Sequence, residues 1–259
     1  MNMVNLGIPS SDFLASVREA LGREDAPPAD PYAPLQDDLD AIEERASSAR
    51  QRIAGELPNL MDSLARTAAL RGWNVERCGG VEETLDYVVS LAGRLGVVSA
   101  ARSDQPVFEA IPVDAALAGI GAMCWPAIYE GADARETVRR RLAESGMGIT
   151  GADYAIAETG SVIVLPRKGL SRLVSVVPPV HVAIVSPQDV LGTLDDLFAL
   201  RRLEFHRNGA SGNGDMGSYL NFITGPSRTA DIEQTIVVGV HGPREVHMVL
   251  LDDGSTGSS

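Results

Sequence analysis

Apolar residues recur at helical spacing near the start of the chain. Over residues 11–22, Leu14, Val17 and Leu21 fall on one face at intervals of three and four, which predicts a short amphipathic helix. Residues 26–34 are rich in proline. Because proline fixes φ and lacks a backbone N–H, this stretch is expected to be an extended linker. The first helix is therefore predicted to be an arm that packs on a body or on a partner.

The rest of the chain alternates between amphipathic stretches and short apolar runs. Helices are expected over 35–54, 57–71, 81–95 and 133–145, and from Ser186 to about 203. Strands are expected over 73–76, 96–99, 161–165, 181–185, 221–224, 235–238 and 246–251. This alternation predicts an α/β fold with three αβα layers around a mainly parallel sheet. The expected parts are a helix and linker (1–34), an α/β domain (35–252) and a flexible tail (253–259).

Charge and composition exclude several classes of protein. The 259 residues include 22 basic and 35 acidic side chains, for a net charge of −13 at pH 7. This balance argues against nucleic acid as a main partner, because phosphate backbones are bound by basic surfaces. No segment approaches the roughly 18–20 apolar residues of a membrane span. The residues at 1–4 show no secretory signal, so a cytoplasmic location is expected.

The scarce cysteines and lysine limit the chemistry further. Cys78 and Cys124 are the two cysteines, too few for a four-thiolate zinc site or an iron–sulfur cluster without outside ligands. Lys168 is the one lysine, and Gly169 follows it. A Walker-type phosphate loop needs serine or threonine after its lysine, so that nucleotide site is absent.

A first candidate for chemistry is the segment Glu158-Thr159-Gly160-Ser161, which stands directly before a predicted buried strand. A carboxylate there is costly unless it is hydrogen-bonded or faces a cleft. Glu158 is therefore either a site residue held by a glycine turn or a solvated acid in an ordinary turn.

A second candidate is residues 224–233, which follow a predicted strand. Open α/β sheets bind ligands beyond the carboxyl ends of their strands, and this block is expected at such an edge. Arg228 could clamp an anion, and Asp231 or Glu233 could act as a base. The alternative is a polar helix cap with Asp231 at the cap position. The candidate ligand contacts of the block are Thr224, Gly225, Ser227 and Arg228.

Two further groups of polar residues remain open between a functional and a structural role. Arg167, Lys168 and Arg172 could bind a phosphate or carboxylate, or form a solvated loop. His181 opens a strand and His241 lies at a strand end, so either could face a cleft or be a structural histidine. The spacing of the histidines is not that of a metal pair, and no metal site is expected.

Taken together, four blocks of sequence resemble the LUD-domain family. They are 155–161 (Ala-Ile-Ala-Glu-Thr-Gly-Ser), 178–182 (Pro-Pro-Val-His-Val), 223–233 (Ile-Thr-Gly-Pro-Ser-Arg-Thr-Ala-Asp-Ile-Glu) and 239–243 (Gly-Val-His-Gly-Pro). The resemblance is strong over about 130–252 and weaker over 35–130. It implies a fold like that of the ribose-5-phosphate isomerase and CoA-transferase group.

The resemblance also implies a role in oxidising L-lactate to pyruvate, beside iron–sulfur partner subunits that carry the clusters. No cofactor is expected on this chain, and its expected ligand is a small carboxylic acid. Whether the chain is itself an enzyme stays open. One alternative is an independent transferase or hydrolase for a CoA-linked or phosphorylated acid, with Glu158 as nucleophile by analogy with the related transferases. The other is a non-catalytic interaction subunit that docks through residues 11–22.

The residues put forward as catalytic are Glu158, Asp231 and Glu233. Those put forward as substrate or anion contacts are Thr159, Gly160, Arg167, Lys168, His181, Thr224, Gly225, Ser227, Arg228 and His241.

Overall fold

The computed structural model describes residues 10–20, 38–128, 134–165, 172–210, 219–230 and 236–252. The chain divides into two units, residues 1–41 and 42–259. In the first unit, helix α1 (Ser10–Ala20) confirms the predicted N-terminal helix. The proline-rich linker lies outside the described residues, and the predicted domain boundaries stay a prediction.

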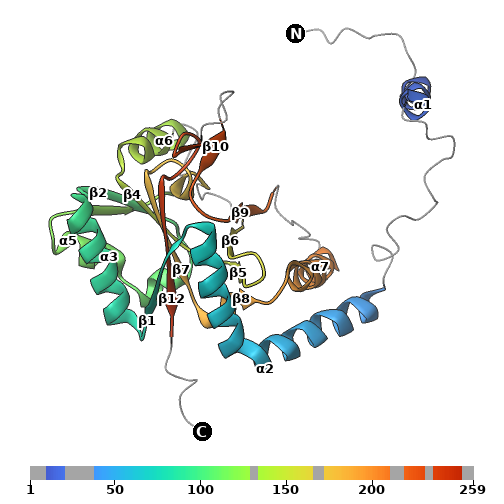
Figure 1. Cartoon of the computed structure of the whole chain (residues 1–259), viewed down its shortest axis with the longest axis horizontal. Coiled ribbons are helices and arrows are strands. Elements are labelled where there is room, and N and C mark those ends of the chain that lie inside the picture. The colour runs from blue at the N-terminus through green and yellow to red at the C-terminus, as the bar shows by residue number, and fades with distance from the viewer. Residues whose placement is uncertain are drawn as a thin grey trace. The chain divides into compact units, whose positions relative to one another are not determined.

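The second unit is built on a six-stranded sheet in which every pairing is parallel (Figure 1). Its strand order is β1-β12-β7-β4-β2-β3. The strands are β1 (Asn74–Cys78), β2 (Ser99–Arg102), β3 (Met123–Pro126), β4 (Met147–Gly151), β7 (Val180–Val185) and β12 (Glu245–Leu251). The mainly parallel sheet of the predicted fold is thereby confirmed.

Helices cover both faces of this sheet, which explains why its central strands are apolar throughout. All six residues of β7 are buried, as expected for a strand covered on both sides. Val182 and Ile184 face helices α3 (Val81–Leu95) and α5 (Val113–Ala118). On the other face of β7, Ala183 and Val185 pack against the carboxyl-terminal half of helix α2 (Leu39–Arg71). Helix α6 (Ala134–Glu144) packs near β2 and β3, and the short helix α4 (Val107–Ala110) follows β2.

A second, smaller sheet lies between the main sheet and helix α7 (Leu194–Ala210). Its order is β8-β5-β6-β9, with strands β5 (Tyr154–Ile156), β6 (Ser161–Val164), β8 (Val190–Leu191) and β9 (Asn221–Ile223). Strands β10 (Arg228–Ala230) and β11 (Ile236–Val238) form a separate antiparallel hairpin. The predicted runs at 161–165, 221–224 and 235–238 thus contain the strands β6, β9 and β11, which are not strands of the parallel sheet.

Two predicted helices differ from the structure. Residues 39–54 and 57–71 of these two segments belong to one helix, α2, which continues through Pro58 and bends along its length (Figure 1). The prediction that a helix begins at Ser186 is wrong. Ser186 and Asp189 form a capping box, but it opens only the 3₁₀ turn η3 (Pro187–Asp189). The chain then pairs with β5 as β8, and α7 starts at Leu194.

Helix α2 and helix α7 pack against each other beside the small sheet. Ile42 and Ala46 of α2 form a small core with Leu203 of α7, and Leu197 joins the core beneath β5 and β6. No helix among the described residues is long and apolar enough to cross a membrane.

Candidate functional site

The two sequence blocks around Thr159 and Thr224 do meet in space. Thr159 Oγ1 donates to Ser161 Oγ at 2.8 Å, and Ser161 Oγ is hydrogen-bonded to Thr224 Oγ1 at 2.8 Å. These three hydroxyls form a chain between β6 and the end of β9. Residues more than sixty positions apart therefore share one polar cluster.

Two glycines seat this cluster on the carboxyl-terminal end of α2. Gly160 has φ of +68°, and a Cβ there would lie 2.7 Å from the backbone N of Ala68. Gly225 has φ of +129°, and a Cβ would lie 2.4 Å from the carbonyl oxygen of Arg71. Both positions combine a left-handed conformation with direct backbone contact, so a side chain fits neither. The glycines thus hold the two blocks against the helix.

Ser227, Arg228 and His241 continue the cluster toward the start of β12. The Ser227 N–H donates to the carbonyl of Pro243 at 2.8 Å, and its Oγ accepts from the His241 N–H at 3.3 Å. The guanidinium of Arg228 lies within 3.5 Å of the Arg71 carbonyl oxygen. Pro243 comes two residues before β12 begins, so this loop lies at the amino edge of the parallel sheet. We call residues 159–161, 224–228 and 241–243 the amino-edge cluster.

For residues 224–230, the described part of the block 224–233, this position corrects the prediction of a carboxyl edge. Strand β9, which precedes the block, pairs antiparallel with β6 in the small sheet. The chain then turns toward the amino ends of β7 and β12. The apolar run at 221–224 identified a strand, but a short run does not reveal which sheet it joins.

His181 is fully buried near the amino end of β7. Its Nε2 is hydrogen-bonded to Thr150 Oγ1 at 2.9 Å, and its ring lies 6.1 Å from the ring of Trp73. Burial, with His247 as a second cause, lowers the pKa of His181 to about 3. A neutral, fully buried imidazole attracts no anion by charge, so its contacts support a structural role.

Glu158 stands apart from the cluster. Its side chain is exposed, and Oε2 accepts a hydrogen bond from the Leu194 N–H at 3.1 Å. Leu194 is the first residue of α7, where a carboxylate is favoured by the unpaired N–H groups and the helix dipole. This contact gives Glu158 a capping role, and its role as nucleophile stays a prediction. Asp231, Glu233, Arg167 and Lys168 lie outside the described residues.

The opposite edge of the sheet holds a cavity of about 480 Å³ that sequence reasoning missed. Residues that follow β1, β12, β7, β4 and β2 all line it, so it lies across the carboxyl ends of five neighbouring strands. We call it the carboxyl-edge cavity. Its polar lining residues include Gln105, Asp153, Ser186, Asp189 and Asp252.

The cavity includes the point where the chain changes direction across the sheet. After β2 the chain continues to its outer neighbour β3, whereas after β4 it continues inward to β7 and β12. Gln105 follows β2 and Asp153 follows β4, and Gln105 Nε2 donates to Asp153 Oδ2 at 3.2 Å. Adjacent strands whose connections diverge leave a crevice between their loops, and open α/β sheets bind ligands there.

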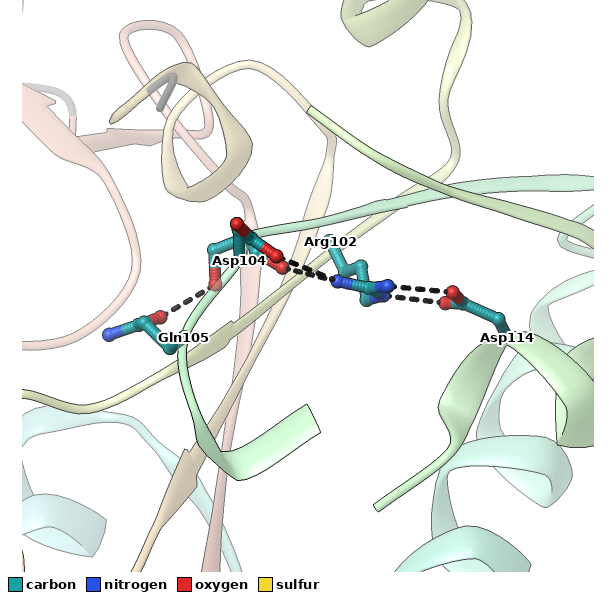
Figure 2. Close-up of polar contacts among 5 residues, drawn as sticks. Arg102, Asp104, Gln105 and Asp114 are labelled. Carbon is teal, nitrogen blue, oxygen red and sulfur yellow. Dashed lines mark hydrogen bonds and ion pairs between the residues drawn. The ribbon is translucent and has the colours of Figure 1, made fainter. Parts of the chain in front are cut away.

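A fixed polar network supports this wall of the cavity. Asp153 Oδ2 also accepts from the Leu165 N–H at 2.7 Å, and Gln105 Oε1 accepts from Ser103 Oγ at 2.6 Å. At the end of β2, Arg102 lies between Asp104 and Asp114, with its Nε 2.7 Å from Asp114 Oδ1 (Figure 2). Figure 2 shows Gln105 on the far side of Arg102 from Asp114.

Asp189 is a lining residue of this cavity whose carboxyl pKa is shifted. Burial and the nearby Asp153 carboxylate raise the pKa of Asp189 to about 6. Its Oδ2 accepts a hydrogen bond from the Ser186 N–H at 3.4 Å, as part of the capping box of η3. A carboxyl group that titrates near neutral pH in a cavity is suited to accept a proton from a ligand.

The sequence is matched by the model of one protein family. The description of that model is LUD domain, and it matches residues 61–251, which contain both the amino-edge cluster and the carboxyl-edge cavity. The chain belongs to the LUD-domain family.

Curated relatives carry one shared name, lactate utilization protein C. The protein of that name from Halalkalibacterium halodurans is 36% identical over 118 residues, 46% of this chain and 49% of the relative. Those from Shouchella clausii and Geobacillus kaustophilus are 30% and 31% identical over 68% and 69% of this chain, or 70% and 76% of the relatives. The match to the first relative thus spans about half of that protein's length.

A solved structure of a DUF162 family protein from Deinococcus radiodurans is similar at 18% identity and a TM-score of 0.46. The aligned region covers 76% of this chain and 97% of the Deinococcus radiodurans chain.

The two cysteines of this LUD-domain chain lie at opposite edges of the parallel sheet. Cys78 is in β1 and Cys124 in β3, the two edge strands, roughly 24 Å apart at the usual strand spacing. Burial raises the pKa of both thiols, and Asp114 raises that of Cys124 further. Metal ligation needs thiolates that converge on one point, so these two cannot share a cluster.

Proposed function

We propose that this chain acts in the utilization of L-lactate, as a subunit that binds the small acid while iron–sulfur partners accept the electrons. Membership of the LUD-domain family and the name shared by its curated relatives support the role in lactate utilization. The wide separation of Cys78 and Cys124 supports the division of labour, because cluster chemistry then falls to other subunits.

Within the chain, the carboxyl-edge cavity is the proposed ligand site. The observation that carries this assignment is Asp189, a carboxyl with its pKa near 6 in a cavity at the topological switch point. Oxidation of lactate to pyruvate releases two electrons and two protons. In the proposed step this carboxylate accepts the hydroxyl proton, the iron–sulfur partners accept the two electrons, and the proton from the C–H bond passes to solvent.

The carboxylate of lactate needs a different wall of the same cavity, because Asp153 and Asp189 repel it. Gly80, the N-cap of helix α3, and Val81, its first residue, also line the cavity, and Gly80 provides no side-chain cap. The N–H groups of a first helical turn attract anions. In the proposed orientation, the hydroxyl of lactate therefore faces Asp189 and its carboxylate faces the start of α3.

The amino-edge cluster remains the competing location. It keeps the predicted contacts Thr159, Gly160, Thr224, Gly225, Ser227, Arg228 and His241 close together or on adjoining loops. Arg228 is the cation of this cluster that could meet a carboxylate. The hydrogen bonds and close glycine contacts described above already account for most of its residues as packing.

Removal of this chain from cells that grow on L-lactate tests the proposed role. We expect the loss of L-lactate oxidation with normal growth on pyruvate, because pyruvate enters metabolism after the proposed step. Restoration by the wild-type chain, and recovery of iron-containing subunits when it is purified from those cells, would support the proposal. Undiminished L-lactate oxidation without the chain would contradict it.

A further inference from the structure

A larger cavity, of about 650 Å³, lies between α2 and α7 and is not part of the proposed lactate site. Apolar side chains from both helices and from β8 line it: Ile53, Leu57, Leu191, Leu200 and Leu203. The volume falls in the usual range for small-molecule sites, which are mainly apolar with a few placed polar groups. An apolar ligand body is therefore compatible with this cavity.

The charged residues of this cavity are not balanced. Glu204 is ion-paired with Arg201, and Arg207 is paired with Glu43 at 3.0 Å. Arg50 also lines the cavity and, within the part of the chain that the structure describes, forms no ion pair. One positive charge is thus left at the edge of an apolar cavity, in a chain of net charge −13.

The neutral polar groups of the lining add donors rather than negative charge. Tyr154 lies in the wall, and burial raises the pKa of its phenol, so the hydroxyl stays protonated at neutral pH. Gln188 lines this cavity and the carboxyl-edge cavity alike, so the 3₁₀ turn η3 separates the two. The two cavities differ in character, because aspartates are the charged residues of the carboxyl-edge cavity, whereas this one is lined by aliphatic side chains, two arginines and one glutamate.

We propose that the cavity between α2 and α7 binds an amphipathic carboxylate, with its aliphatic body between the two helices and its carboxylate at Arg50. The apolar lining favours the body through burial of its surface, and the unbalanced guanidinium selects an anionic head group. This site is independent of the lactate site, and either can fail without the other.

Three ligands of equal chain length and different charge test the proposal: octanoate, 1-octanol and octylammonium. Their binding to the full chain is measured by isothermal titration calorimetry. We expect octanoate to bind more tightly than octanol by about tenfold, the factor of one charge-assisted hydrogen bond. Octylammonium is expected to bind most weakly of the three.

Two variants and a control locate the binding. Arg50→Gln should remove the preference for octanoate over octanol, whereas Ala54→Phe, at an exposed position of the lining, should weaken all three ligands by filling the cavity. Arg66→Gln changes an exposed arginine of the same helix away from the cavity and should change nothing. Thermal unfolding shows whether each variant is folded.

The proposal is overturned if none of the three ligands binds, or if octylammonium binds as tightly as octanoate. It is also overturned if folded Arg50→Gln and Ala54→Phe both bind octanoate like the wild type.

Discussion

The two edges of the parallel sheet differ in what their loops do. At the amino edge, hydroxyl contacts and glycines in direct contact with α2 fill the space between segments. At the carboxyl edge, five loops leave a cavity of about 480 Å³. Asp189 lines this cavity, and the pKa of its carboxyl group is raised to about 6. The edge with the recognisable sequence blocks is thus tightly packed, and the edge without them has the geometry of a ligand site.

Strand β7 connects these two environments. His181 is near its amino end, fully buried and neutral, whereas Asp189 follows its carboxyl end beside the cavity. Burial disfavours the charged form of both groups, so it lowers the pKa of the histidine and raises that of the aspartate. The contributions of His181 and Asp189 to the stability of the fold should therefore change with pH in opposite directions.

The largest effect is expected at the packed amino edge. Gly160→Ala adds a Cβ against the Ala68 backbone at φ of +68°, whereas Gly96→Ala adds one in open space at φ of +64°. We expect Gly96→Ala to cost about 1 kcal/mol, from backbone strain alone, and Gly160→Ala about 3 kcal/mol or more. Urea denaturation of the two variants measures the difference. Equal losses would show that the amino edge is not closely packed.

The second effect is the pH response of His181. Its folded pKa, about 3, is below the unfolded value of 6.5, so its contribution to stability is complete above pH 6.5 and declines as pH falls. Between pH 6.5 and 4.5 this amounts to about 2–3 kcal/mol. His181→Phe should lack this decline. The free energies of unfolding of wild type and variant across this range give the answer, and parallel curves would contradict the buried neutral histidine.

Asp189 should show a somewhat smaller effect of opposite sign. Its folded pKa of about 6 is above the unfolded value of 3.8, so its favourable contribution is present below pH 3.8 and lost as pH rises through 6. Asp189→Asn should therefore be more stable than the wild type at pH 7.5, by about 1–2 kcal/mol after allowance for partial exposure.

The gain from Asp189→Asn should disappear near pH 4, where the wild-type carboxyl is protonated. Asp86→Asn, at an exposed position of α3, makes the same change of net charge and serves as the control. A gain of equal size at both pH values would indicate a packing effect instead.

The smallest effect concerns Glu158 and separates its two possible roles. Glu158→Ala removes the acceptor from the Leu194 N–H and should cost about 0.5–1 kcal/mol, the usual value for a lost helix cap. Glu158→Gln keeps an acceptor oxygen and should recover part of that loss. Thermal unfolding measures both variants. Mass spectrometry after incubation with acyl-CoA checks the alternative role, since an adduct on Glu158 would establish it as a nucleophile.

Much of the fold follows from local patterns in the sequence. The period of apolar residues predicts α3 over its exact length, and the β-branched run predicts β7. What the patterns leave out is the partner of each strand. Residues 161–165 and 181–185 are both short apolar runs, yet one joins the small sheet and the other the parallel sheet.

The candidate site shows the same division. Blocks of glycine and hydroxyl residues identified the amino-edge cluster in the sequence, because positive φ and close backbone contact require glycine at Gly160 and Gly225. Gln105, Asp153 and Asp189 lie on three different loops and have no common local motif. Only the strand order brings them together, so the sequence alone could not have identified them.

Lactate-dependent oxygen uptake tests most directly which edge holds the ligand site. Cells that lack the chain are supplied with Asp189→Asn, Ser227→Ala or the control Asp86→Asn, each at the wild-type protein level. If Asp189 accepts the proton, its loss should reduce uptake by about tenfold or more, whereas the other two variants stay within about twofold of wild type. Normal uptake with Asp189→Asn and a large loss with Ser227→Ala would contradict the account and place the site at the amino edge.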